Sequence, residues 1–501
     1  MQFDRAGILV LRGLKSLQPA REVIRGVRLA RLYPLLFVED DVMSRRLPGP
    51  TDWLFGFGNV YRLRNYPLQF ILDSGRTYGD IVSFRLPLPP FRLYLVNNPD
   101  LIREVLIAKG KSFRKLAEHT RVLKQFAGNG LVASEGDFWL RQRRLVQPAF
   151  HARRMSRYAQ VVVDHTRRML ERWRSGTEVN MPHEMRQLTA EIIVKALFDA
   201  ELTGNAGRLT EVSQILSDTT IRETIAPFRL PDWLPLPGKR RKRWALQTLN
   251  RLISDIIKAR RASGEDKGDL LSMFLLAVDD EGDKRGMTDQ QVHDEVVSLF
   301  TAGHDTVAAA LTWTWYAIAR HPDVEARLLQ EVESALSARS ATFDDLPGLK
   351  YTEMVAKESL RLYPPLWGLM TRETITDVEL GGYEIPKGSW IFLSPYVTHR
   401  DPRFFENPEQ FDPQRFGAGR SEQIPPYAYF PFGAGPHVCI GNAFAMMEMT
   451  LIVPTILQQF RVALAPGQGE VEPEPHITIR PKGGLRMAVS KRAALAMVGT
   501  E

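Results

Sequence analysis

The side chain best suited to chemistry in this chain is Cys439, the only cysteine among 501 residues. A loop rich in glycine and proline leads to it from Phe432, and an apolar helical pattern from Asn442 to Leu451 follows it. A thiolate there would lie near a helix N-terminus, where unpaired backbone N–H groups favour negative charge. Glycines at positions 433, 435 and 441 would let the backbone approach a flat, bulky group closely. The ordinary alternative is a buried, unreactive cysteine in a tight loop.

The spacing of this stretch favours the reactive alternative. Phe-x-x-Gly-x-His-x-Cys-x-Gly resembles the haem-ligand loop of the cytochrome P450 family. The resemblance implies that Cys439 is the axial thiolate of a haem b iron and that His437 and Gly441 contact the haem. Arginine is the commoner residue at position 437. Histidine can also donate to a haem propionate, but with a pH-dependent charge.

A second candidate site lies within a long predicted helix. Residues 288–291 (Thr-Asp-Gln-Gln) fit a capping box, and a helical pattern continues from there to Arg320. Residues 302–306 (Ala-Gly-His-Asp-Thr) lie in its middle, where Gly303 costs about 1 kcal/mol relative to alanine. A glycine and a threonine that hydrogen-bonds to its own helix can open a groove for a small ligand, and an adjacent acid can supply protons through water.

This segment is similar to the oxygen-activation motif of the same family. The resemblance implies that Thr306 hydrogen-bonds the bound dioxygen, that Asp305 relays protons towards it, and that Ala302 contacts the haem. Val307 stands where many members have Thr or Ser, which would alter the chain of waters without removing it. Considered alone, Asp305 and Thr306 are explained as well by a surface acid and a helix-packing threonine.

Two further groups of residues match the family pattern in the expected order. Trp139 and Arg143 are four residues apart and share one helix face, which alone indicates an aromatic ring under an arginine stem. The resemblance implies instead that both bind a haem propionate, since a guanidinium can give a carboxylate two hydrogen bonds. Glu358, Arg361 and the later Arg415 are similar to the family's buried triad, which fixes the cysteine loop and has a structural role.

Three features leave the prediction open or depart from the family. Related sequences often place a propionate-binding arginine where this chain has Thr371. Arg372 is adjacent, but an offset of one residue in a strand reverses the face.

Pro454 should kink or shorten the helix that follows the cysteine. Residues 113–130 are polar and interrupted by glycine, and we interpret much of this stretch as a mobile loop.

The chain as a whole predicts one large domain. Strand patterns at residues 81–84 and 91–96 precede a long run of helical periodicity, and no repeat or low-complexity linker divides the sequence. The resemblance covers roughly residues 47–490. It implies a single domain over residues 47–501 that is mainly α with a smaller β-rich lobe, the cytochrome P450 fold. Residues 1–46 are interpreted as a basic N-terminal extension.

The composition of the chain indicates where the protein is located and which classes of partner it can have. The formal charge is +8, and one cysteine excludes an intrachain disulfide. No zinc spacing or RNA-binding motif supports a nucleic acid partner. The longest uncharged runs of residues 1–46 are far shorter than the roughly 20 apolar residues of a membrane span. We therefore expect a cytoplasmic protein without a transmembrane anchor. An amphipathic arrangement of arginines in the extension allows peripheral membrane contact, although a solvated helix face explains it better.

The implied activity is that of a haem-thiolate monooxygenase. Such an enzyme inserts one oxygen atom of O2 into an apolar substrate, such as a fatty acid or a terpenoid. No spare cysteines exist for an iron–sulfur cluster, so we expect a ferredoxin or flavodoxin, with its reductase, to supply electrons. Such an acidic partner would be attracted by Arg141, Arg144, Arg153 and Arg154. The alternatives are a peroxide-driven peroxygenase, a haem sensor or electron carrier, and a structural protein without haem.

Overall fold

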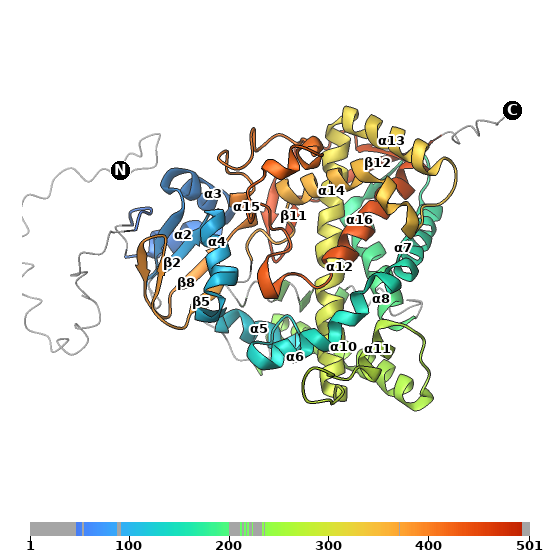
Figure 1. The fold of residues 1–501 in the computed structure, drawn as a ribbon. Helices are drawn as coiled ribbons and strands as arrows, with labels where there is room; N and C mark the ends of the chain where they lie inside the picture. Colours follow the sequence, from blue (N-terminus) through green and yellow to red (C-terminus); the bar gives the residue numbers. More distant parts are fainter. Residues whose placement is uncertain are drawn as a thin grey trace, which may run out of the picture. The chain divides into compact units, whose positions relative to one another are not determined.

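The computed structural model describes residues 47–52, 55–87, 92–199, 236–369 and 371–492, together with residues 211–212, 215–216, 218–219, 223 and 233–234. The predicted extension over residues 1–46 lies outside this range. From Leu47 onwards the chain forms one compact unit, in which a large helical part adjoins a smaller β-rich part (Figure 1). This confirms the mainly α architecture with a β-rich lobe. Within the described ranges, no helix has the length and apolar character needed to cross a membrane.

The helical part holds most of the chain. The α-helices of the described residues, in chain order, are α2 (Phe57–Asn65), α3 (Pro67–Tyr78), α4 (Pro99–Arg103), α5 (Ala117–Ala127), α6 (Gly136–Val146), α7 (Ala152–Arg172), α8 (Met181–Phe198), α10 (Pro237–Ser263), α11 (Leu270–Leu276), α12 (Asp289–Arg320), α13 (Pro322–Leu336), α14 (Lys350–Leu362), α15 (Pro395–Thr398) and α16 (Asn442–Leu457).

The strands are short and form several small sheets. They are β1 (Ile81–Arg85), β2 (Arg92–Val96), β3 (Phe113–Lys115), β4 (Thr177–Asn180), β5 (Arg372–Thr374), β6 (Val378–Leu380), β7 (Tyr383–Ile385), β8 (Trp390–Leu393), β9 (Phe460–Leu464), β10 (Pro473–Pro475), β11 (Ile479–Pro481) and β12 (Arg486–Lys491). The largest sheet has the order β1-β2-β8-β5-β3, and its β2–β8 pair is parallel. This sheet joins segments about 300 residues apart, as in the pair Leu93 and Trp390.

Helix α12 is the long helix predicted from the sequence, and it runs through the helical part beside α16 (Figure 1). The predicted capping box is present: Gln291 N donates to Thr288 Oγ1 at 3.2 Å, and Thr288 N donates to Gln291 Oε1 at 2.9 Å. Most residues from Val292 to Ile318 are buried. A helix buried on nearly all sides serves as a rigid support for the residues at its middle.

Residues 113–130 are not a mobile loop, so that prediction is wrong. Strand β3 pairs antiparallel with β5, and α5 follows it directly. The next turn is fastened to α12, because Asn129 N donates to Asp294 Oδ2 at 2.8 Å and Leu131 N donates to Glu295 Oε2 at 3.0 Å. These partners lie more than 160 residues away in sequence, so local composition could not reveal them.

Pro454 does not end α16, which continues to Leu457. The proline lies near the end of the helix, where Gln458 N donates to its carbonyl oxygen at 2.9 Å. Only one intrahelical bond is lost, since proline lacks an N–H. The helix that follows the cysteine is therefore longer than the pattern ending at Leu451 predicted.

Candidate active site

The loop before Cys439 is folded tightly against its surroundings. Cys439 N donates to the carbonyl oxygen of Phe432 at 2.9 Å, which closes the loop. Gly433 and Gly435 have φ of 71° and 70°, a region that favours glycine. A Cβ on Gly435 would lie 2.7 Å from Leu106 O, so no larger residue fits there. Gly441 has an ordinary φ of −92° and caps α16.

The Cys439 thiol lines a space bounded by protein. The residue is accessible to a water-sized sphere, yet burial raises the pKa of its thiol. Both observations hold for a sulfur that faces an internal cleft and is surrounded by protein beyond it. The Gly441 N–H and the charge of Arg143 act in the opposite direction, because both favour the thiolate. Burial remains the larger of these effects, so the pKa of the free thiol lies above its ordinary value.

Trp139 and Arg143 both contact the cysteine loop from α6. The Trp139 ring lies 3.9 Å from the His437 ring, centroid to centroid. The Arg143 Nη1 donates to the carbonyl oxygen of Val438 at 2.7 Å. The structure thus brings together three residues that the sequence singled out separately, Trp139, Arg143 and His437, beside Cys439.

Positive charges gather around His437. Burial lowers the pKa of this imidazole, and the charges of Lys115, Arg372 and Arg143 lower it further, to about 3, so His437 is neutral. Burial also lowers the pKa of Lys115 to about 8 and lowers the pKa of Arg372. The Glu135 carboxylate lies 3.9 Å from the Lys115 Nζ, and the charge of Glu295 also acts on this ammonium. One buried ammonium and two half-buried guanidinium groups so close together favour an anionic ligand.

Lys115 is a site residue that the sequence did not indicate. Its Nζ donates to the carbonyl oxygens of Ser134 at 2.7 Å and Val132 at 3.1 Å, so the ammonium is held in place. The structure also distinguishes the adjacent residues Thr371 and Arg372, for which the sequence left the propionate contact open. Arg372 acts on His437, whereas Thr371 is buried and its carbonyl accepts from Leu116 N at 2.8 Å.

The middle of α12 is less buried than the rest of the helix. Ala302 is exposed, although most of the helix on either side is buried. Thr306 Oγ1 donates to Ala302 O at 2.7 Å, which confirms that this threonine hydrogen-bonds to its own helix. Gly303 has a packing reason too, because a Cβ there would lie 3.3 Å from Ile193 Cδ1 on α8.

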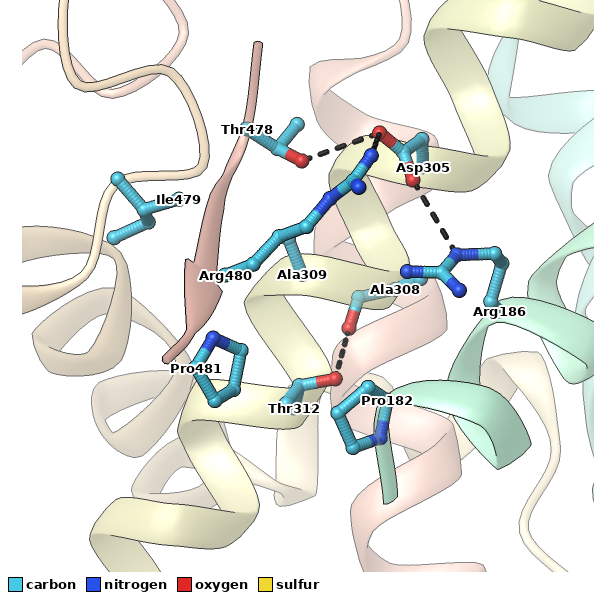
Figure 2. A pocket seen from close by; sticks show the side chains of 10 residues that line it. All are labelled: Pro182, Arg186, Asp305, Ala308, Ala309, Thr312, Thr478, Ile479, Arg480 and Pro481. Atoms are coloured by element: carbon cyan, nitrogen blue, oxygen red, sulfur yellow. Dashed lines mark hydrogen bonds and ion pairs between the residues drawn. The ribbon is translucent and has the colours of Figure 1, made fainter. Parts of the chain in front are cut away.

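Asp305 leaves α12 in another direction and lies between two arginines (Figure 2). Its carboxylate is 3.6 Å from Arg186 Nε and 3.8 Å from Arg480 Nη2, and it accepts a hydrogen bond from Thr478 Oγ1 at 3.1 Å. These residues line a small pocket with room for about one water. Asp305 is therefore not an isolated surface acid.

Comparison with known proteins decides the family. The family model described as Cytochrome P450 matches residues 47–486. The chain belongs to the cytochrome P450 family. It is 38% identical over 437 residues to cyclooctatin synthase of Streptomyces melanosporofaciens, which covers 87% of this chain and 94% of that protein.

Two other relatives are similar over comparable lengths. Cyclooctat-9-en-7-ol 5-monooxygenase of Streptomyces melanosporofaciens is 39% identical over 428 residues, 84% of this chain and 90% of that protein. Pentalenene oxygenase of Streptomyces avermitilis is 32% identical over 436 residues, 87% of this chain and 95% of that protein.

This cytochrome P450 is a monooxygenase, and its cofactor is haem b. The residues present fit that group: Cys439 is accessible, and Lys115, Arg143 and Arg372 place positive charge around His437, where two propionates would supply negative charge. The haem provides the oxygen-activating chemistry when it is bound. The reaction also uses O2, an apolar substrate and a redox partner.

The Glu358 network of this cytochrome P450 is buried. Arg361 donates through Nε to Glu358 Oε2 at 2.7 Å and through Nη2 to Oε1 at 2.8 Å, and Arg415 Nε lies 3.3 Å from Oε1. Arg361 Nη1 also donates to His399 O at 2.8 Å, and His399 Nε2 accepts from Phe430 N at 3.0 Å. These bonds link the triad to the residues just before the cysteine loop.

Proposed function

We propose that this cytochrome P450 oxidises a terpenoid, a cyclic and largely hydrocarbon molecule. The observation that carries the proposal is the 38% and 39% identity, over most of both chains, to two enzymes with related names. One of them names its substrate, cyclooctat-9-en-7-ol, and its position of oxidation, carbon 5. A third relative is named for pentalenene.

A binding screen tests the substrate class. Purified holoenzyme is titrated with cyclic terpene hydrocarbons, cyclic terpene alcohols and fatty acids matched in carbon number, while the haem spectrum reports the change of spin state. We expect saturable shifts with members of the cyclic terpene series and weaker ones with fatty acids. Tighter binding of fatty acids throughout would contradict the proposal.

We assign the haem contacts to the residues around the cleft. Cys439 is the iron ligand, and the backbone N–H of Gly441 and the charge of Arg143 support its thiolate form. Lys115, Arg143 and Arg372 supply the positive charge for the propionates. His437 would donate one hydrogen bond to them. Trp139 packs on that imidazole and fixes its orientation.

We assign proton delivery to Asp305 and Thr306. A water in the pocket beside Arg186 and Arg480 brings protons to the Asp305 carboxylate, which those arginines hold at the edge of α12. Thr306 Oγ1 uses its proton in the bond to Ala302 O, so its lone pairs are left to accept a hydrogen bond from a water or ligand in the cleft. Ala302 leaves room for that group, because its methyl is small.

Replacing Thr306 by alanine tests this assignment. The variant should bind substrate and accept the first electron like the wild-type enzyme. It should divert consumed O2 into hydrogen peroxide, because proton delivery is disordered while electron supply is intact. The measurement is the ratio of product to hydrogen peroxide per reductant consumed. An unchanged ratio would leave Thr306 as a packing residue.

We further propose that a ferredoxin or flavodoxin docks on the face formed by α6 and the cysteine loop. Two of the four arginines expected to attract it are engaged within the chain. Arg141 lies 3.2 Å from Asp283, and Arg144 lies 2.7 Å from Asp279. Their charges are thus largely offset, and the net charge of +8 must act through other basic groups.

Leu140 offers a cleaner test of this docking face than either arginine, because it is exposed on α6 without a charge partner. Leu140→Glu should slow reduction by the acidic partner protein and leave reduction by dithionite unchanged. Val60→Glu is the matched control, since Val60 is similarly exposed on α2, away from α6 (Figure 1). Equal slowing by both variants would place the docking site elsewhere.

For location, we propose a cytoplasmic enzyme with peripheral membrane contact. The predicted contact through residues 1–46 lies outside the described residues, but α2 gives independent support. Phe55, Phe57 and Tyr61 are 70%, 64% and 60% exposed, and Arg62 and Arg64 are exposed beside them. Aromatic rings flanked by arginines suit an anionic lipid surface. Sedimentation with anionic vesicles should carry down the wild-type enzyme and less of Tyr61→Ser. Equal sedimentation would contradict this contact.

A further inference from the structure

Helix α8 contacts the proton-delivery segment of α12 through a buried hydroxyl. Thr189 Oγ1 lies 2.9 Å from the carbonyl oxygen of His304, and also 2.9 Å from Met185 O and 3.3 Å from Arg186 O on its own helix. Only 1% of Thr189 is exposed. A hydroxyl has one proton, so the bond across to α12 competes with an ordinary bond back to α8.

Two neighbours on the same face of α8 contact the adjacent positions of α12. Arg186, three residues before Thr189, pairs with Asp305. Ile193, four residues after it, packs against Gly303 at the distance of a tight contact. Residues spaced by three and four lie on one side of a helix. One strip of α8 therefore contacts three consecutive residues, Gly303, His304 and Asp305.

The carbonyl that Thr189 reaches belongs to the peptide bond between His304 and Asp305. A carbonyl oxygen has two lone pairs, so it can accept a helical N–H and this hydroxyl together. The second bond fixes the orientation of that peptide plane. The direction in which the Asp305 side chain leaves α12 follows from that plane, and Thr306 is the next residue.

We propose that Thr189 is a positioning residue for proton delivery. Its hydroxyl holds the His304–Asp305 peptide, so that Asp305 stays at the pocket shared with Arg186 while Thr306 faces the cleft. The inference rests on the proposed roles of Asp305 and Thr306. It extends them to a residue of another helix that touches neither haem nor substrate.

The test compares three variants of the holoenzyme. Thr189→Val removes the hydroxyl at nearly constant shape, and Thr189→Ser restores it. The matched control is Thr166→Val on α7, where a fully buried threonine donates only to its own helix, to Val162 O at 2.7 Å. We expect the ratio of product to hydrogen peroxide to fall about fivefold in Thr189→Val, the factor that one ordinary hydrogen bond is worth. Thr189→Ser should recover most of it, and Thr166→Val should match the wild-type enzyme.

Two readouts besides activity separate positioning from a general loss of structure. The substrate-induced change of spin state should be unaltered in Thr189→Val, because the substrate site is intact. Hydrogen exchange should be faster in a peptide covering residues 300–310 of Thr189→Val than in the same peptide of Thr166→Val. Equal exchange and an unchanged product ratio in Thr189→Val would overturn the proposal.

The failure of this inference can be told from a failure of the proposed function. If Thr306→Ala diverts O2 into peroxide and Thr189→Val does not, only the positioning role of Thr189 is wrong. If Thr306→Ala leaves the ratio unchanged, the relay itself is wrong, and the role of Thr189 fails with it. If the ratio of product to hydrogen peroxide falls as far in Thr189→Ser as in Thr189→Val, the hydroxyl of Thr189 does not position Asp305.

Discussion

Replacing Glu358 by glutamine should destabilise the protein strongly, because it removes the only carboxylate of a buried network with two arginines. Glu358 and Arg361 are fully buried, and Arg415 is 6% exposed. Glutamine keeps one acceptor oxygen but turns an NH2 group towards guanidinium donors. Breaking a buried pair by removing one partner costs about 3–5 kcal/mol. We expect a loss in this range, at the upper end because Asp412 N also donates to Glu358, at 2.8 Å.

Urea unfolding of the holoenzyme, followed by circular dichroism, measures this loss. Glu472→Gln is the control, because the Glu472–Lys482 pair has a similar separation, 2.8 Å, and is exposed on both sides. The control should unfold at the urea concentration of the wild-type protein. Haem transfer to apomyoglobin should be faster in Glu358→Gln, since the network is linked to Phe430 before the cysteine loop. A loss below 1 kcal/mol would refute the idea that this network is desolvated and holds the loop.

Two further predictions concern α12 and the haem cleft. Burial raises the pKa of Glu295 to about 7, so the folded state binds its proton more tightly than the unfolded state does. Stability should therefore fall as pH rises from about 4.5 to 7, by at most about 3 kcal/mol. Glu295→Gln should flatten this dependence in urea unfolding at pH 5 and pH 8, and an unchanged slope would contradict it. Arg372→Met should speed haem dissociation about tenfold or more, because it removes the free energy of a charge-assisted hydrogen bond. Thr371→Val should leave the dissociation rate unchanged. Equal dissociation rates for the two variants would exclude Arg372 as a propionate contact.

The sequence predicted those features that depend on local spacing. The capping box at Thr288 and Gln291 defines where α12 begins, and the glycine-rich loop leads to Cys439 as expected. The four-residue spacing of Trp139 and Arg143 placed both on one face of α6, and the structure brings that face to the loop. Each of these depends on residues within a few turns of each other.

Contacts between distant segments could not be predicted from the sequence in the same way. Lys115 lies in a strand of three residues, too short for a periodic pattern, and its role depends on pairing with β5 far along the chain. Arg141 and Arg144 looked like free surface charges until the fold placed Asp279 and Asp283 beside them. Thr189 lies in an ordinary helical pattern, and only the packing of α8 on α12 directs its hydroxyl to His304 O.

The spectrum of the reduced carbon monoxide complex tests the central claim most directly, the ligation of haem iron by the Cys439 thiolate. The purified protein is reduced under carbon monoxide, and its Soret band is compared with that of a histidine-ligated haem protein. The account predicts a band at clearly longer wavelength, and its loss in Cys439→Ser even where some haem remains bound. A histidine-like band in active wild-type protein, or an unchanged band in Cys439→Ser, would contradict it.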